Sequence, residues 1–171
     1  MGERTGVRVL SALAPATMLA VDPWGWFPFG PVKWALVSTL ALAASALVFR
    51  TRPVAVPRIL AGALAILLAW LSLAAALGAD PLYAWIGTPE RRFGVVTWAL
   101  CGLLLLVGLA LDGERDARCV VTGTLVAGAG VGAVATLEAL GWEPDVLNVG
   151  RRLTGTFGSA AYLGAATALL L

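Results

Sequence analysis

The chain has 171 residues, of which 60% are hydrophobic and only 13% charged, and its net charge is +2. The apolar residues form runs too long for the amphipathic helices of a soluble domain, so the composition indicates an integral membrane protein and argues against nucleic-acid binding. The chain has no histidine, two cysteines and no Cys-x-x-Cys pair, which argues against a zinc site and against Ser-His-Asp chemistry.

The apolar runs predict transmembrane α-helices, because most are near the roughly 20 residues of a span and none alternates like a barrel strand. The last run has only 12 residues and would rise about 18 Å, less than the ~30 Å of a bilayer core. We therefore predict one all-α, polytopic membrane unit over residues 1–171, with five complete spans and the start of a sixth. The runs are Val7–Val21, Pro31–Phe49, Ile59–Ala79, Val95–Leu111, Cys119–Trp142 and Ala160–Leu171.

The first run has two interpretations. It is short, contains Pro15 and follows Arg4 and Arg8, as a signal peptide would. However, it leads directly into the aromatic stretch 22–29, which suits the headgroup region. The aromatic stretch favours a retained helix.

Basic residues indicate the orientation of the chain. The turn from Arg50 to Arg58 is the most concentrated and least acid-compensated group, so we place it in the cytoplasm, with the N-terminus on the same side. The outer loops are then residues 22–33, 80–94 and 143–159, and two of them contain an arginine doublet. The predicted cytoplasmic residues are Arg4, Arg8, Arg50, Arg52, Arg58, Arg115 and Arg118, and the predicted outer ones are Lys33, Arg91, Arg92, Arg151 and Arg152.

The fifth run contains a Gly-x-x-x-Gly spacing at Gly128 and Gly132. Read together with Gly130 and Ala133, it also resembles a dinucleotide-binding fingerprint, but the βαβ context that this fingerprint needs is missing. Small residues at this spacing let membrane helices approach closely, so we predict helix packing through this pair.

Most tryptophans lie near the predicted membrane boundaries, where an aromatic belt is expected. This group comprises Trp24, Trp26, Trp34, Trp85 and Trp142. Sugar stacking by Trp85 is a second interpretation. For the two cysteines, Cys101 and Cys119, we predict free thiols, since Cys119 adjoins a loop placed in the reducing cytoplasm.

The loop at residues 143–159 has the composition of an anion-binding segment. Arg151 and Arg152 offer bidentate donors to phosphate, and the glycines that follow let backbone N–H groups approach closely. The N-terminus of the next helix adds a favourable partial positive charge. The alternative is that both arginines only anchor a helix end in the headgroups.

Arg152-Leu153-Thr154-Gly155-Thr156-Phe157-Gly158-Ser159 resembles the R-x-x-G-T-F-G-N-P-N stretch of the O-antigen ligase and polymerase superfamily. The arginine, both glycines, the second threonine and the phenylalanine match, whereas Ser159, Ala160 and Ala161 replace Asn, Pro and Asn. Residues 80–94 are similar to the family's outer loop W-x-G-x-x-x-R-x-x-G. Residues 22–34 are similar to its aromatic loop followed by Pro-x-Lys.

The resemblance implies a membrane glycosyltransferase without cofactor or essential metal. It would transfer glycan from an undecaprenyl-diphosphate carrier to a glycan acceptor, on the outer face of the bacterial cytoplasmic membrane, in the synthesis of lipopolysaccharide or another cell-surface polysaccharide. The family's catalytic arginine and histidine usually lie in a large outer loop further along. The chain is therefore expected to be an N-terminal fragment that is inactive alone and contains no assigned catalytic residue.

Within this fragment, Arg152, Arg151, Arg92 and Arg91 are the candidates for binding the diphosphate. For Arg91 and Arg92, interface anchoring beside Glu90 is an equal alternative. The competing functional class is a non-catalytic membrane protein or a transporter of anions or other solutes. That class needs only the topology and the arginines in the outer loops.

Overall fold

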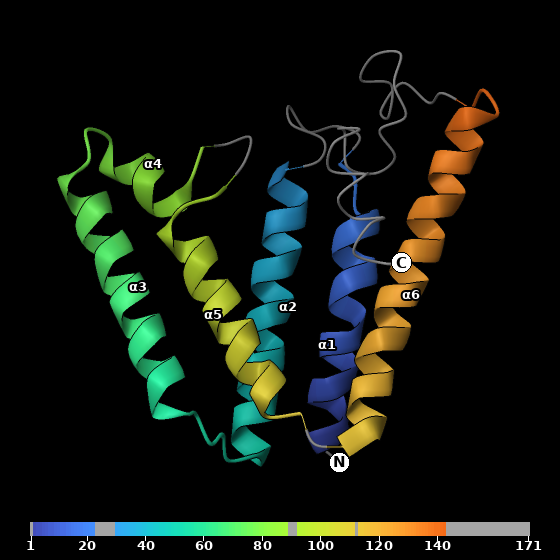
Figure 1. Cartoon of the computed structure of the whole chain (residues 1–171). Helices are drawn as coiled ribbons and strands as arrows, with labels where there is room; N and C mark the ends of the chain where they lie inside the picture. The colour runs from blue at the N-terminus through green and yellow to red at the C-terminus, as the bar shows by residue number, and fades with distance from the viewer. Residues whose placement is uncertain (1, 23–29, 89–91, 112, 143–171) are drawn as a thin grey trace.

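The computed structural model describes residues 2–22, 30–88, 92–111 and 113–142 (Figure 1). All regular structure in these residues is α-helical, which confirms the predicted all-α class. Five helices coincide with the first five predicted runs, while the run from residue 160 lies outside the described residues. The helices are α1 (Gly2–Leu19), α2 (Gly30–Thr51), α3 (Arg58–Leu77), α4 (Pro81–Ile86), α5 (Val95–Leu109) and α6 (Gly113–Ala139).

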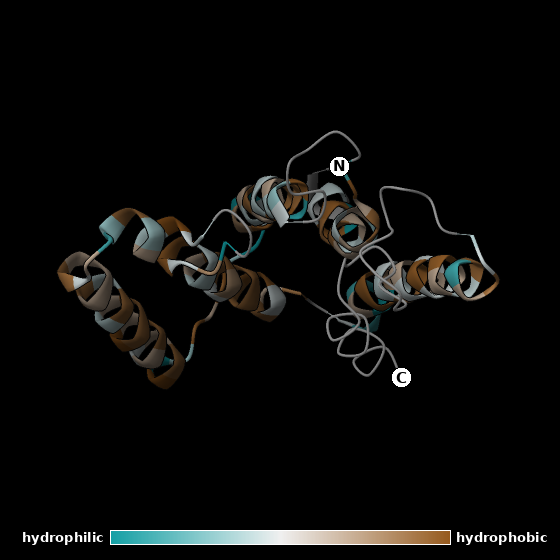
Figure 2. Cartoon of the chain, turned by 90° about the horizontal axis from the view of Figure 1, so that it is seen from above, coloured by the Kyte–Doolittle hydropathy of each residue, from teal (hydrophilic) through white to brown (hydrophobic). Residues whose placement is uncertain are grey.

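The long helices stand side by side in one curved row. Helix α1 packs between α2 and α6, α5 packs on the other side of α2, and α3 lies beyond α5 (Figures 1 and 2). Consecutive long helices run in opposite directions. We call the end that holds α4 the upper end, and the end that holds the start of α1 the lower end, as drawn in Figure 1.

Three helices, α2, α3 and α6, are long and apolar enough to cross a membrane. Helices α1 and α5 are apolar but shorter. The 15 residues of α5 rise about 22 Å, against the roughly 30 Å of a hydrocarbon core. The helical membrane character is thus supported, but the predicted count of five spans is not confirmed.

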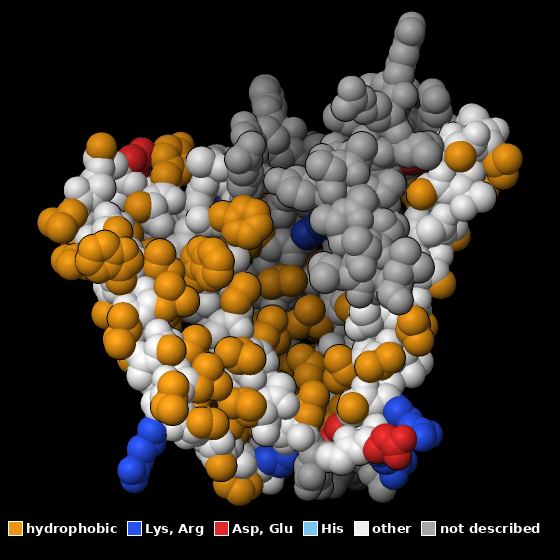
Figure 3. Space-filling view, in the orientation of Figure 1, with side chains coloured by type: hydrophobic (Ala, Val, Ile, Leu, Met, Phe, Trp, Pro, Cys, Tyr) orange, Lys and Arg blue, Asp and Glu red, His pale blue; other side chains and the backbone are white. Residues whose placement is uncertain are grey.

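The row leaves apolar side chains exposed over much of the surface (Figure 3). On α3, Ile59 is 89% exposed, Ile66 72% and Leu77 78%. A continuous apolar surface of this kind suits lipid, where backbone polar groups must be satisfied within each helix. Contact with a lipid bilayer follows from this surface.

The described charged side chains lie near the upper and lower ends of the helices. Because the helices alternate in direction, Arg50, Arg58 and Arg118 lie at the lower end, where Figure 3 shows basic side chains. Lys33 and Arg92 lie at the upper end. For these residues the structure has the same division into two sides that the arginine pattern predicts.

Helices α1 and α6 approach each other closely at Gly123, which lies outside the predicted glycine pair. A Cβ added at Gly123 would lie 2.0 Å from the carbonyl oxygen of Ser11. The buried positions of α6 are Gly123, Ala127 and Val131, spaced one turn apart. A Cβ added at Gly132 would meet no described atom within 4 Å, so the packing predicted for Gly132 is wrong.

A second close approach joins α1 to α2. A Cβ added at Gly6 would lie 3.0 Å from Val48 Cγ2 and 3.2 Å from Leu47 Cβ. Val48 is 1% exposed and forms a small core with Val107 and Ala110 at the end of α5. Helix α1 thus contacts each of its two neighbours at a glycine, Gly6 with α2 and Gly123 with α6.

Arg52 ties three helices together at the lower end. Its Nη1 donates to Asp116 Oδ2 on α6 at 2.5 Å and to the carbonyl oxygen of Ala110, after α5, at 3.1 Å. The side chains of Arg52 and Asp116 are only 14% and 15% exposed. By contrast, Arg118 and Glu114 form an ion pair one turn apart on α6 that is 74% and 79% exposed.

The Gly123 contact predicts a sharp difference between two glycine substitutions on α6. Gly123→Ala should destabilise the protein by about 1–3 kcal/mol, since its methyl group would overlap the backbone at Ser11. Gly132→Ala should change stability by less than about 0.5 kcal/mol. Unfolding in detergent micelles, followed by circular dichroism, measures both. Equal effects of the two substitutions would contradict this packing.

The two ion pairs predict a second difference. Arg52→Ala leaves a mostly buried carboxylate and a carbonyl without this donor, so we expect a loss of about 1–3 kcal/mol. Arg118→Ala breaks an exposed pair and should cost no more than about 0.5 kcal/mol. The same unfolding measurement, made at low and at high salt, gives the loss of stability for each substitution. A loss for Arg52→Ala as small as that for Arg118→Ala would rule out the three-helix tie.

Candidate functional site

The connection between α3 and α5 at the upper end, which the sequence predicts to be a loop, contains a short helix. Helix α4 begins at Pro81, after Asp80, whose side chain accepts a hydrogen bond from the Tyr83 backbone N–H at 3.3 Å. An aspartate cap followed by proline is a common helix start. The helix ends at Gly87, whose N–H donates to the Tyr83 carbonyl at 2.8 Å and whose φ of 88° favours glycine.

Gly87 and Gly94 bring the two ends of the following segment into backbone contact. A Cβ at Gly87 would lie 2.3 Å from the Phe93 nitrogen. A Cβ at Gly94 would lie 2.3 Å from the Trp85 carbonyl oxygen and 2.5 Å from the Gly87 nitrogen. Any side chain at either position would push the segment apart, so the two glycines close it.

Arg92 lies just inside this closure, immediately before α5. Its backbone has a φ of 53°, unusual for a residue other than glycine, and its N–H donates to the Thr88 carbonyl at 2.8 Å. Its guanidinium carbon lies 5.8 Å from the centre of the Trp34 ring, within the range of a cation–π contact. Its Nε is buried and has no hydrogen-bond partner among the described residues.

Thr97 joins Arg92 to Trp34. Its hydroxyl oxygen accepts a hydrogen bond from the Trp34 indole N–H at 3.0 Å and donates to the Arg92 carbonyl oxygen. Trp34 lies near the start of α2, and Thr97 in the first turn of α5. The Trp34–Thr97–Arg92 cluster therefore links two helices and the glycine-closed segment at one point.

Lys33, the residue before Trp34, has a structural role. Its Nζ donates to the carbonyl oxygens of Thr17 at 2.9 Å and Met18 at 2.7 Å. These carbonyls lie at the end of α1, where orphan acceptors and the helix dipole both favour a cation. Lys33 thus holds the end of α1 against the start of α2.

Of the four predicted anion-binding residues, the structure describes only Arg92. Arg91, Arg151 and Arg152 lie outside the described residues, so no contact among the four is given. Sequence reasoning missed Thr97 and interpreted Trp34 only as a belt residue. No local signal pointed to their pairing, because 63 residues separate them.

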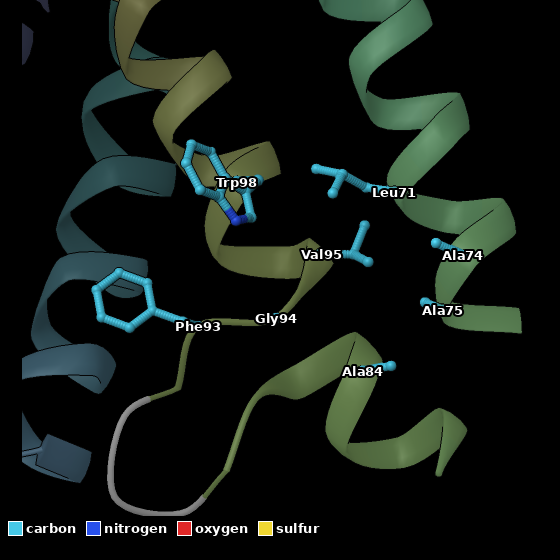
Figure 4. Close-up of a pocket in the computed structure, with 8 residues that line it drawn as sticks. All are labelled: Leu71, Ala74, Ala75, Ala84, Phe93, Gly94, Val95 and Trp98. Carbon is cyan, nitrogen blue, oxygen red and sulfur yellow. The ribbon is translucent and has the colours of Figure 1, made fainter. Parts of the chain in front are cut away.

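A small apolar pocket lies between α3, α4 and the start of α5 (Figure 4). It has a volume of about 210 Å³. Its walls carry no charged side chain, so it suits a hydrocarbon group rather than a phosphate. The lining residues are Leu71, Ala74, Ala75, Ala84, Phe93, Gly94, Val95 and Trp98.

The described residues contain no group of three potential metal ligands among His, Cys, Asp and Glu. Cys101 and Cys119 are free thiols, as predicted. In the described part of the upper end, the candidate for binding an anion is the Arg92 guanidinium beside the Trp34 indole. No protein-family model, curated protein or solved structure matches this chain.

The glycine closure predicts that Gly87→Ala destabilises the upper end. The substitution combines a positive φ with a Cβ 2.3 Å from the Phe93 nitrogen, so we expect a cost of about 1–3 kcal/mol. Gly108→Ala on α5 is the matched control, since its Cβ would meet nothing within 4 Å. Thermal unfolding in detergent micelles measures both; a neutral Gly87→Ala would exclude the closure.

Proposed function

We propose that this chain is the N-terminal part of an O-antigen ligase-like or polymerase-like membrane glycosyltransferase. The enzyme transfers glycan from an undecaprenyl-diphosphate carrier to an acceptor, in the synthesis of lipopolysaccharide or another cell-surface polysaccharide. The observation that carries the proposal is the Arg92 guanidinium, held over Trp34 with a buried Nε–H that has no described acceptor. Such a group is suited to an anionic ligand.

The proposal includes a topology. The chain crosses the bacterial cytoplasmic membrane with five complete spans and the start of a sixth, and its N-terminus lies in the cytoplasm. Arg50, Arg52, Arg58, Arg115 and Arg118 support this orientation, since all lie at the lower end, close to the helix termini. The upper end, with Arg92, then faces outward, where a lipid-linked glycan would be used.

In this proposal Arg91, Arg92, Arg151 and Arg152 bind the carrier diphosphate. Phosphate oxygens accept paired hydrogen bonds from a guanidinium, and lipid surroundings strengthen such charge-assisted bonds. The likeness of residues 152–159 and 80–94 to the family's motifs supports the same assignment. We propose that the arginines of this chain position the carrier rather than catalyse the transfer.

An anion transporter is the second candidate, because a guanidinium at the membrane surface also fits capture of a free anion. The two functions differ in their products. A transporter changes the uptake of a solute and leaves the glycan unchanged, whereas a transferase changes the pool of carrier-linked glycan.

The test uses the complete protein in cells. Arg152→Ala and Arg92→Gln should each cause undecaprenyl-linked glycan to accumulate and should reduce transfer at least roughly tenfold, as expected for loss of a charge-assisted hydrogen bond. Arg118→Gln is the matched control, since its exposed pair with Glu114 lies at the lower end. The measurement is the amount of carrier-linked glycan in membrane extracts.

Normal carrier-linked glycan in both the Arg152 and the Arg92 variant, with each protein present at its usual level, would refute the transferase. Altered uptake of an anion in the same cells would instead establish the transporter.

A further inference from the structure

We infer that Thr97 is a positioning residue, which aims the Arg92 guanidinium at a phosphate-type anion by fixing both Arg92 and its aromatic partner Trp34. The inference rests on the proposed function, because it assigns Thr97 to the same anion site.

The Thr97 hydroxyl does two things that need a donor and an acceptor in one group. It accepts from the Trp34 indole N–H at 3.0 Å and donates to the Arg92 carbonyl oxygen. Among side chains of this size only serine offers the same pair of functions, whereas valine has the same shape and neither function. Thr97 therefore differs from the other described threonines on α2 and α6, such as Thr39, whose hydroxyl donates to the Ala35 carbonyl one turn back.

Arg92 needs this support because of its backbone. A φ of 53° is unfavourable for a residue with a Cβ, and such a conformation persists only where the surroundings enforce it. Two hydrogen bonds do so: the Arg92 N–H donates to the Thr88 carbonyl, and its carbonyl accepts from Thr97. The direction in which the Arg92 side chain leaves the backbone is thereby fixed.

The same hydroxyl also fixes the surface on which the guanidinium rests. With its N–H bound to Thr97, the Trp34 ring presents its face to Arg92, whose Cζ lies 5.8 Å from the ring centre. A guanidinium that interacts with the face of an indole keeps N–H groups for hydrogen bonds to other partners. Planar, paired donors match two oxygens of a phosphate, so the geometry selects a phosphate or diphosphate group.

The test compares four variants of the whole protein in detergent micelles: Thr97→Val, Thr97→Ser, Arg92→Gln and Thr39→Val. The protein is labelled with 5-fluorotryptophan, and the Trp34 resonance is assigned from Trp34→Phe. Inorganic diphosphate is then titrated while the ¹⁹F spectrum is recorded. The unchanged protein should show a saturable shift of the Trp34 resonance.

We expect Thr97→Val to weaken the apparent affinity at least roughly tenfold and to move the Trp34 resonance before any ligand is added, as expected for loss of an oriented hydrogen bond. Thr97→Ser should restore the affinity for diphosphate to within about threefold of the unchanged protein. It should also return the Trp34 resonance close to its original chemical shift. Thr39→Val should change neither. Rescue by serine and not by valine would assign the effect to the Thr97 hydroxyl rather than to its methyl group.

Two different failures are distinguishable. If Arg92→Gln binds diphosphate as tightly as the unchanged protein, the anion site of the proposed function is refuted, and the positioning role with it. If Arg92→Gln loses affinity while Thr97→Val keeps it, the anion site stands and the positioning role is overturned. Failure of Thr97→Ser to restore binding would also overturn the positioning role.

Discussion

The close approach of α1 to its two neighbours is the constraint on which the rest of the structure depends. In lipid, helices gain little from excluding solvent, so their association depends on tight van der Waals contact at small residues. Gly6 supplies such a contact with Leu47 and Val48 on α2, and Gly123 supplies one with Ser11 from the side of α6. These two contacts fix the order α6, α1, α2. They also bring the start of α2, with Trp34, to the upper end of the molecule, where α1 ends.

Different contacts hold the helices together at the lower end and at the upper end. At the lower end, Arg52 connects α2, α5 and α6 directly, and Figure 1 shows the helices closest together there. At the upper end the helices spread apart, and among the described residues the side-chain contacts between them are pairwise: Lys33 joins α2 to α1, and Trp34 joins α2 to α5. Local closure adds to these contacts: Gly87 and Gly94 fold the segment before α5 onto itself, and Thr97 connects that segment to α2. The candidate site thus depends on backbone contact and one hydroxyl group rather than on a packed core.

Much of the fold could be predicted from the sequence because it depends on local composition. Uninterrupted apolar runs predict the five long helices to within a few residues, apart from the early starts of α1 and α6, and arginine placement predicts which connections share an end. Helix α4 was missed although Asp80 and Pro81 signal a helix start, because the stretch was too short for a span. The packing glycines could not be chosen by spacing alone, since Gly123 and Gly132 differ only in what faces them. The contact between Trp34 and Thr97 depends on how α2 and α5 dock, which no local pattern encodes.

The distribution of charge bears on the choice between transferase and transporter. A path for a charged solute needs polar groups along the depth of the membrane, and such groups are rare and functional where they occur. In the described helices, α5 has no charged side chain and α3 has one only at Arg58, its first residue. Ser45, buried in α2, donates its hydroxyl to the Ala41 carbonyl of its own helix. In the described part of the chain, charged side chains are thus confined to regions near the upper and lower ends of the helices. This distribution favours recognition of an anionic headgroup at the surface over passage of an anion between these helices.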